Sequence, residues 1–289
     1  MFDLCYNIII TQIMNLNNLT PDIISGLCYT DFIALLKETN RCPGGKKTIR
    51  RIRELLHIDK NSKILDVGSN TGFTSLEFAR ITPALIYGIE ISEACVEASN
   101  KILSEDIEDI KSRVNFQLAN AYDIPFKENT FDIIMVGGAT SFMARKNIAI
   151  SEYFRVLKPW GFLVMSPLTY HKDPPVAITD SVGEILNNRI NPMKKEDWLK
   201  VVYEAVSEFE LYTHESQKLN ARTQNDIDAY VQYFLKKDHI QKLTPDVIEA
   251  IKIKWLEIIN VFNENHKYLG YDIMIFRKRT DSEEPELFI

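Results

Sequence analysis

Two carboxylates follow short apolar runs, and glycines stand beside the first of them. Asp66 lies near the end of the run 63–67, just before the loop Gly68–Gly72, and Glu90 directly follows the run 85–89. Glycines between a strand and a helix leave backbone N–H groups at the helix N-terminus, where an anionic group can bind. A carboxylate at the end of the next strand can accept hydrogen bonds from both hydroxyls of a ribose. The spacing therefore predicts one site that binds a ribose and an anionic group.

Two other nucleotide-binding patterns do not fit this loop. The dinucleotide pattern G-x-G-x-x-G fails because Asn70 and Phe73 occupy two of its glycine positions. A P-loop is excluded because the sequence Gly-Lys-Ser/Thr does not follow the glycines. Only 11 glycines occur in 289 residues. Six of them lie in three short stretches, which indicates backbone that bends sharply or approaches a ligand: Gly44-Gly45, Gly68 with Gly72, and Gly137-Gly138.

Apolar runs alternate with amphipathic segments in the first part of the chain. Strands are predicted at 63–67, 85–89, 114–118, 131–136 and 161–165, with helices at 74–80, 92–103 and 147–157. This alternation indicates a parallel sheet covered on both faces. The second part predicts a helix at 196–206, a strand at 208–217, two helices that begin near Thr223 and Thr244, and a last strand at 270–276. We therefore expect an α/β fold with a doubly wound, mostly parallel, seven-stranded sheet.

The expected organisation is a single domain with additions. It comprises an N-terminal helical segment at 1–60, a core at 61–220 and 267–280, a helical insertion at 221–266 that serves as a lid, and a polar tail at 281–289. Thr20-Pro21-Asp22 predicts the start of the first helix, and Met14 is an alternative start to Met1. The segment 2–14 lacks a basic region and a cleavage site, so we expect a cytoplasmic protein without a membrane span.

The composition and net charge of the chain exclude several classes of protein and disfavour one class of partner. The chain is 45% hydrophobic and 26% charged, which excludes a disordered chain, a collagen-like repeat and a membrane bundle. The net charge of -6 disfavours nucleic acid as the main ligand. A basic stretch at 41–53 is either the solvated face of a helix or a phosphate-binding patch. The four cysteines have no C-x-x-C spacing, so we expect reduced thiols and no metal site.

Taken together, these residues resemble the class I S-adenosylmethionine-dependent methyltransferases of the small-molecule type. Asp66–Gly72 matches the first motif of that family, and Glu90 matches its ribose-binding acid. Asn120, which begins the run 120–126, falls where the family often has an adenine-contacting acid. The run 131–134 matches the fourth strand. The resemblance implies a Rossmann-like fold, and it extends by motif from about residue 41 to residue 165.

Further segments support or qualify the resemblance. Pro43-Gly44-Gly45 resembles a loop that covers the methionine end of the cofactor. The turn 155–161 matches a family turn, except that Trp160 replaces a glycine. The stretch 136–139 lacks the Asn/Asp-Pro-Pro-Tyr pattern, which argues against methylation of amino groups on nucleic-acid bases. Cys42 precedes the first strand, the wrong place for a nucleophile in cytosine chemistry, and the paired glutamates of protein arginine methyltransferases do not follow the fourth strand.

The resemblance implies a cofactor and a reaction. The cofactor is S-adenosyl-L-methionine, and the reaction is methyl transfer to a nitrogen, oxygen or carbon atom of a small-molecule acceptor. The residues expected to bind the cofactor are Gly44, Gly45, Asp66, Gly68, Ser69, Asn70, Gly72, Glu90, Ile91, Asn120, Ala121 and Gly137.

The residues expected to contact the acceptor or to act as a general base lie outside the cofactor motifs. His171 follows the fifth strand and is the candidate general base, although it can equally be an exposed loop histidine. His214 is a weaker candidate for the same role. The candidate acceptor contacts are aromatic, and their stripe on the insertion can also serve only to dock that helix: Tyr170, Tyr230, Tyr233 and Phe234.

Two other functions remain open at this level. The basic stretch 41–53 could dock RNA or protein for a methyltransferase with a macromolecular substrate. Alternatively, the chain could bind the cofactor as a regulatory protein without transferring the methyl group. The oligomeric state is open as well.

Overall fold

The computed structural model describes residues 19–39 and 41–279, so the segment 2–14, the alternative start at Met14 and the tail at 281–289 lie outside the described residues. The chain forms two compact units. The first, here the sheet unit, comprises Thr39–Thr169, Met193–Lys218 and Gly270–Ile289. The second, here the helical unit, comprises Met1–Glu38, Tyr170–Pro192 and Leu219–Leu269.

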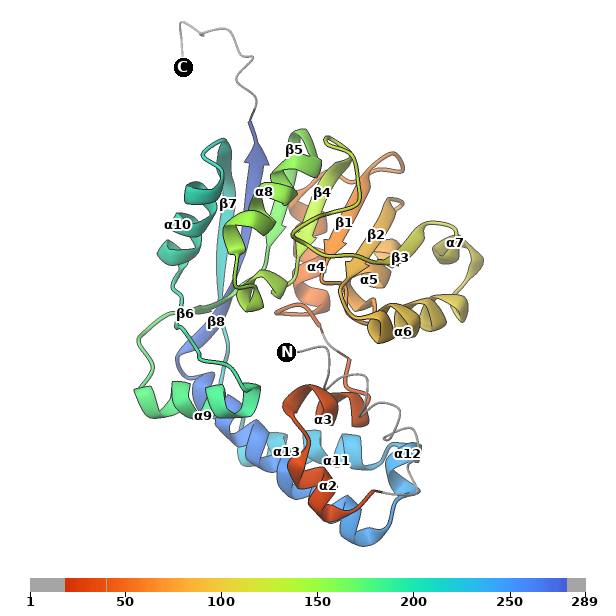
Figure 1. Cartoon of the computed structure of the whole chain (residues 1–289), viewed down its shortest axis with the longest axis vertical. Coiled ribbons are helices and arrows are strands. Elements are labelled where there is room, and N and C mark those ends of the chain that lie inside the picture. The colour runs from red at the N-terminus through yellow and green to blue at the C-terminus, as the bar shows by residue number, and fades with distance from the viewer. Residues whose placement is uncertain (1–18, 40, 280–289) are drawn as a thin grey trace, which may run out of the picture. The chain divides into compact units, whose positions relative to one another are not determined.

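The predicted doubly wound, mostly parallel sheet is confirmed. Its strands lie in the order β3-β2-β1-β4-β5-β8-β6, and β7 pairs with β8 (Figure 1). Strands β1 to β5 are parallel, while β8 runs antiparallel to both β5 and β7. The strands are β1 (Lys63–Val67), β2 (Leu85–Glu90), β3 (Val114–Leu118), β4 (Phe131–Val136), β5 (Leu157–Met165), β6 (Leu168–Tyr170), β7 (Phe209–Lys218) and β8 (Leu269–Lys278).

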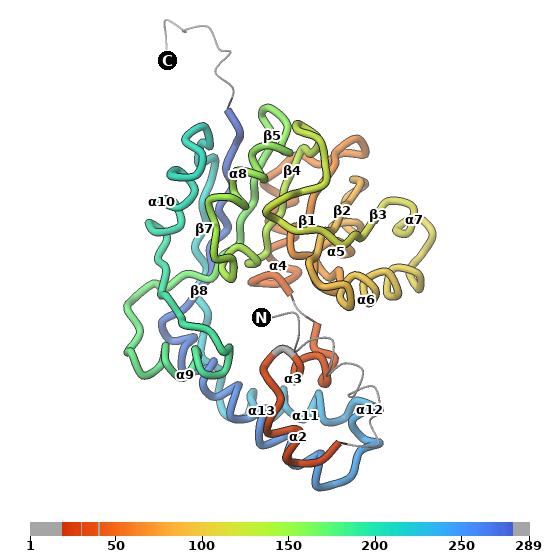
Figure 2. The backbone as a smooth tube through the Cα atoms, in the orientation of Figure 1, coloured from red at the N-terminus to blue at the C-terminus, as the bar shows by residue number. Residues whose placement is uncertain are grey.

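All seven predicted strands are present, and β6 is an additional strand. It contains three residues, which is too short for an apolar periodicity to be recognised in the sequence. Figure 2 shows the chain passing through β1 to β5 and returning as β8 beside β7. This return places β8 beside β5, although the paired residues are more than 100 positions apart in the sequence.

Helices cover both faces of the sheet. On one face, α8 and α10 pack against a buried cluster that includes Val67, Val136 and Met274. On the other face, α4 and α5 pack side by side, and Ser75 of α5 contacts Asp66 of β1. The helical elements of the sheet unit are α4 (Lys46–Leu55), α5 (Phe73–Ile81), α6 (Glu93–Ser104), α7 (Glu108–Lys111), the short 3₁₀ helix η2 (Ala139–Phe142), α8 (Lys146–Val156) and α10 (Lys195–Ala205).

The helical unit has a core of its own. Ile24 and Phe32 from the N-terminal helices pack with Phe234 and Trp255 from the insertion. The unit contains α2 (Pro21–Gly26), α3 (Tyr29–Leu35), α9 (Val176–Leu186), α11 (Gln224–Leu235), α12 (Asp238–Gln241) and α13 (Pro245–Asn265). Three of these helices therefore lie between β7 and β8 in the sequence, and they fold together with the N-terminal helices.

Lysines of the insertion cap the N-terminal helices. The ammonium of Lys254 donates to the carbonyl oxygens of Ser25 and Leu27 at the end of α2, at 2.7 and 2.6 Å. Lys237 donates in the same way to the carbonyl oxygens of Leu36 and Lys37, each at 2.8 Å. A cation at a helix C-terminus satisfies carbonyl groups that lack partners within the helix. Within the described residues, no helix is long and apolar enough to cross a membrane.

Candidate functional site

Four predicted cofactor residues meet at the carboxyl edge of the sheet. The register of β1 with β2 puts Gly68 level with Glu90. The register of β1 with β4 puts Gly137 at this same level on the other side of β1. Glu90 is level with the last residue of β3, so Asn120 follows two residues beyond it. Because adjacent strands lie about 4.8 Å apart, these residues border one crevice.

The loop after β1 is shaped by three residues with positive φ. Gly68 has a φ of 73°, Asn70 of 48° and Gly72 of 87°. Asparagine is one of the few residues with a side chain that adopts this conformation readily, which explains why it can replace the small residue usual in the motif. A Cβ on Gly68 would lie only 2.5 Å from the Cβ of Ala139. The position therefore requires glycine both for its conformation and for space.

Glu90 joins the loop after β1 to the turn after β2. Its Oε2 accepts the N–H of Asn70 at 3.0 Å, and its Oε1 accepts the N–H groups of Ile91 and Ser92 at 2.9 and 3.1 Å. The side chain of Ser92 in turn caps α6. A carboxylate offers about four lone-pair positions. These three bonds fix the orientation of the carboxylate and leave it able to accept further donors from a ligand.

Asp66 brings a second carboxyl into the same region. Its side chain is 2% exposed, and its Oδ2 accepts the hydroxyl of Ser75 at 2.7 Å. Burial raises the pKa of this carboxyl to about 7, the hydrogen bond from Ser75 opposes the rise, and the charge of Glu90 adds to it. A cation near Asp66 would favour its ionised form. The site is thus electrostatically suited to a positively charged ligand.

The loop Cys42–Gly45 packs onto the turn that follows β4. A Cβ on Gly137 would lie 2.8 Å from the Cβ of Cys42, and one on Gly138 would lie 3.7 Å from Cδ of Pro43. The hydroxyl of Thr48 holds the loop by donating to the carbonyl oxygen of Pro43 at 2.6 Å. Burial raises the pKa of the Cys42 thiol to about 12, so the thiol stays protonated at neutral pH.

Asn120 and Ala121 lie in the turn after β3. The Oδ1 of Asn120 accepts the N–H of Tyr122 at 2.9 Å, which is an Asx turn. The amide nitrogen of Asn120 is a potential donor to a ligand. The side chain of Asn120 therefore stabilises the turn after β3, and its contact with an adenine base stays a prediction.

Trp160 occupies a position with glycine-like backbone geometry. Its φ is 64°, which is uncommon for a bulky residue. The guanidinium of Arg277 lies over its ring, 5.1 Å from the centroid. Trp160 therefore adopts the backbone conformation that a glycine would have at this position, although its side chain is a large aromatic ring.

Three hydroxyls at the same edge were not predicted from the sequence. Within the described residues, the oxygens of Ser141, Ser166 and Thr169 are buried and lack a hydrogen-bond partner. Ser141 lies in η2, Ser166 directly follows β5 and Thr169 lies in β6, and Ser166 and Thr169 are 0% and 2% exposed. A buried hydroxyl without a partner costs about 1–3 kcal/mol, so such groups often mark ligand sites. The sequence carries no signal for them, because serine and threonine are common in turns.

His214, the weaker base candidate, forms a strand-to-strand contact. Its Nε2 lies 2.8 Å from Oδ1 of Asp272, a carboxylate that is 1% exposed. The hydroxyl of Ser216 donates to the same carboxylate oxygen. These bonds connect β7 to β8, so His214 gives a buried carboxyl group a hydrogen-bond partner.

The other acceptor candidates belong to the helical unit. His171 is exposed, and its backbone N–H donates to the carbonyl oxygen of Tyr268. Tyr170 is buried, and this burial raises its pKa. Phe234 is 2% exposed in the helical core, Tyr230 packs edge-on against it, and Tyr233 is 64% exposed. The stripe therefore docks α11 through Phe234, while contact of any of these residues with an acceptor stays a prediction.

The basic stretch forms helix α4, as the solvated-face interpretation expects. Ile49 and Ile52 are buried, and Leu56 follows them. Lys46 pairs with Glu77 at 2.9 Å. Arg51 pairs with Glu215 and Glu54, while Lys47, Arg50 and Arg53 are exposed.

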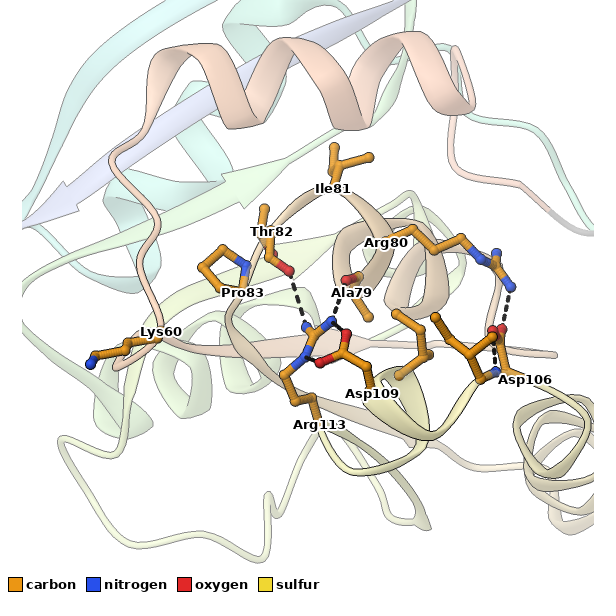
Figure 3. A pocket seen from close by; sticks show the side chains of 11 residues that line it. Lys60, Ala79, Arg80, Ile81, Thr82, Pro83, Asp106, Asp109 and Arg113 are labelled. Atoms are coloured by element: carbon orange, nitrogen blue, oxygen red, sulfur yellow. Dashed lines mark hydrogen bonds and ion pairs between the residues drawn. The ribbon is translucent and has the colours of Figure 1, made fainter.

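A surface hollow lies at the opposite edge of the sheet (Figure 3). Arg113 donates to the carbonyl oxygens of Ala79 and Thr82 at 2.8 and 3.0 Å and pairs with Asp109. Arg80 pairs with Asp106. The guanidinium groups are thus used to tie the segments before β2 and β3 together, and the hollow has a structural role.

The comparisons with known proteins agree with this geometry. Residues 65–165 match the family model described as a methyltransferase domain. A demethylmenaquinone methyltransferase of Symbiobacterium thermophilum is 36% identical over 107 residues, which are 36% of this chain and 42% of that protein. A 27-O-demethylrifamycin SV methyltransferase of Amycolatopsis mediterranei is 23% identical and aligns with 79% of this chain and 81% of its own length.

Solved structures share the fold over most of the chain. The MccD protein superimposes with a TM-score of 0.72 at 26% sequence identity, covering 83% of this chain and all of that one. The alignment to the menaquinone enzyme spans less than half of that enzyme. The residues that match the family model, 65–165, run from β1 to β5.

Proposed function

Because the chain belongs to the class I S-adenosylmethionine-dependent methyltransferases, we propose that it methylates a small cytoplasmic metabolite or natural product. Neither nucleic acid nor a membrane is a partner in this proposal. The observation that carries it is the arrangement of Gly68, Glu90 and Gly137 at one level of the carboxyl edge, with Asp66 beside them. Curated relatives that act on menaquinone precursors and on a rifamycin support the choice of a small-molecule acceptor.

The residues present fit S-adenosylmethionine. Glu90 would hold the ribose hydroxyls, since its carboxylate is fixed by three backbone N–H groups. Asp66 would stabilise the positive charge of the cofactor, which in turn would favour the ionised carboxyl. The turn at Asn120 and Ala121 would border the adenine, and the Cys42–Gly45 loop would cover the methionine end.

The chain contributes alignment and exclusion of water to the reaction. S-adenosylmethionine supplies an activated methyl group on a sulfonium, so little covalent assistance from the protein is needed. Correct orientation of two reactants can lower a barrier by up to about 7–11 kcal/mol. A general base is required only for an acceptor that arrives protonated, and it adds roughly 10²–10⁴-fold. His171 is the residue proposed for this role.

Ser141 and Ser166 are proposed to contact the acceptor. Their buried hydroxyls follow β4 and β5 and make no hydrogen bond to the described residues. A polar group of the acceptor would satisfy them and orient the atom that receives the methyl group. This favours acceptors that carry oxygen or nitrogen close to the reacting atom over purely aliphatic ones.

Formation of S-adenosylhomocysteine tests the proposal. The natural chain is incubated with S-adenosylmethionine and a panel of quinols, phenols, hydroxylated macrolides and small amines. We expect acceptor-dependent product with at least one class, and no product with Gly68→Val, whose added side chain collides with Ala139. Cofactor binding without turnover on a broad panel would instead support a regulatory protein.

A further inference from the structure

The last strand of the sheet reaches the loop that precedes the first strand. Tyr271 lies on β8, and Gly44 lies 227 positions earlier in the Cys42–Gly45 loop. A Cβ on Gly44 would lie 2.3 Å from Oη and 2.5 Å from Cζ of Tyr271. Tyr271 is 7% exposed, so the tip of its ring fills the space directly beside the backbone of Gly44.

The register of β8 explains why Tyr271 reaches this position. Met274 of β8 pairs with Met165, the last residue of β5, so Tyr271 lies three residues beyond that edge. Side chains alternate along a strand, so Tyr271 shares a face with Ile273. Glu215 of β7 pairs with Ile273 and forms its salt bridge with Arg51 of α4. Tyr271 therefore points to the sheet face that α4 covers.

The loop is held from several sides. Cys42 and Pro43 pack on Gly137 and Gly138, and Thr48 bonds to Pro43. A Cβ on Gly44 would also lie 2.2 Å from Oγ1 of Thr48. Gly44 itself has a φ of 75°, a conformation that glycine adopts without strain. Tyr271 supplies the contact from the sheet edge, on the side of the loop that faces β8.

We propose that Tyr271 is a positioning residue that holds the Cys42–Gly45 loop against the carboxyl edge of the sheet. By doing so it sets the residence time of the cofactor in its crevice. The inference rests on the proposed function, because it assumes that this loop covers bound S-adenosylmethionine. A side chain that stabilises a closed loop slows escape of the ligand more than it affects entry. Loss of the Tyr271 side chain should therefore change mainly the dissociation rate constant.

Stopped-flow measurement of S-adenosylhomocysteine binding tests the proposal. Tyr271→Ala removes the ring that contacts Gly44 and should raise the dissociation rate constant at least tenfold. The association rate constant should stay within about twofold of that of the natural chain. Tyr271→Phe keeps the ring, guards against loss of folding, and should raise the dissociation rate two- to fourfold. Tyr212→Phe, a half-exposed tyrosine of β7, is the matched control and should leave both rate constants unchanged.

A double-mutant cycle separates positioning from general destabilisation. Gly44→Ala should weaken binding strongly, since its methyl group collides with Tyr271 and with Thr48 and the position has positive φ. In the Tyr271→Ala background only the collision with Tyr271 is relieved, so the same substitution should still weaken binding but cost at least threefold less. Equal dissociation rates in the natural chain, Tyr271→Phe and Tyr271→Ala, or additive effects in the cycle, would overturn the proposal. Failure of the natural chain to bind S-adenosylhomocysteine at all would instead count against the proposed function.

Discussion

Replacing Asp66 by asparagine should stabilise the protein at alkaline pH while it impairs cofactor binding. The carboxyl is 2% exposed, and burial raises its pKa from 3.8 to about 7. Between these two pH values the folded chain holds a proton that the unfolded chain releases. The free energy of unfolding of the natural chain therefore falls as the pH rises from 4 to 7. Asparagine has no ionisable group at this position, so the free energy of unfolding of the variant does not fall for this reason.

The magnitude follows from the two pKa values of Asp66. At pH 8 the carboxyl is ionised in both states, and a difference of about 3 in pKa costs the folded state about 4 kcal/mol. At pH 5 the unfolded carboxyl is ionised and the folded one is protonated, so the cost is only about 1–2 kcal/mol. The advantage of the variant should therefore grow by about 2–3 kcal/mol between pH 5 and pH 8. Asparagine retains an oxygen that can accept the hydroxyl of Ser75.

Urea unfolding followed by circular dichroism at the two pH values measures this growth. Asp123→Asn, at an exposed position after β3, is the control and should change the free energy of unfolding by less than about 0.5 kcal/mol. An advantage of Asp66→Asn that is the same at pH 5 and pH 8 would refute the reasoning. It would show that the charge of Asp66 does not differ between the folded and unfolded states.

Three further predictions concern binding and stability. Gly68→Val should abolish S-adenosylmethionine binding in calorimetry while the circular dichroism spectrum stays native, because the position has positive φ and lies against Ala139; full affinity would remove the loop from the site. Phe234→Ala should lower the free energy of unfolding by about 3–5 kcal/mol, and Tyr233→Ala by less than about 0.5 kcal/mol, since only the first ring is buried. Neither should change cofactor affinity tenfold, and a tenfold loss in a folded variant would contradict this division. Lys278→Met should cost about 1–3 kcal/mol in urea unfolding, because the buried ammonium donates to two carbonyl oxygens at 2.7 Å; an unchanged midpoint would show that these oxygens find other partners.

The strands and the glycine-containing turn after β1 could be predicted because their signals are local. An apolar run such as 131–136 is buried on both faces of a parallel sheet, and the loop Gly68–Gly72 carries its own turn chemistry. The short strand β6 and the helix α9 were missed because neither has a clear apolar period or cap signal in the sequence.

Other features depend on contacts between distant segments. The insertion and the N-terminal helices share one core, which the sequence could not reveal because Lys254 and Ser25 are more than 200 positions apart. The approach of Tyr271 to Gly44 has the same origin. Residues such as Ser166 gain significance only from burial without a hydrogen-bond partner, a property that residue type alone does not encode.

Calorimetric titration with S-adenosylmethionine tests the central claim most directly. The titration compares the natural chain with Glu90→Ala and with Glu93→Ala, an exposed glutamate three residues further along at the start of α6. We predict saturable binding to one site in the natural chain and in Glu93→Ala. Glu90→Ala should bind at least tenfold more weakly, because the charged acceptor of the ribose hydroxyls is lost. Equal affinity of Glu90→Ala and the natural chain, or no binding by the natural chain, would contradict the assignment of this crevice as the cofactor site.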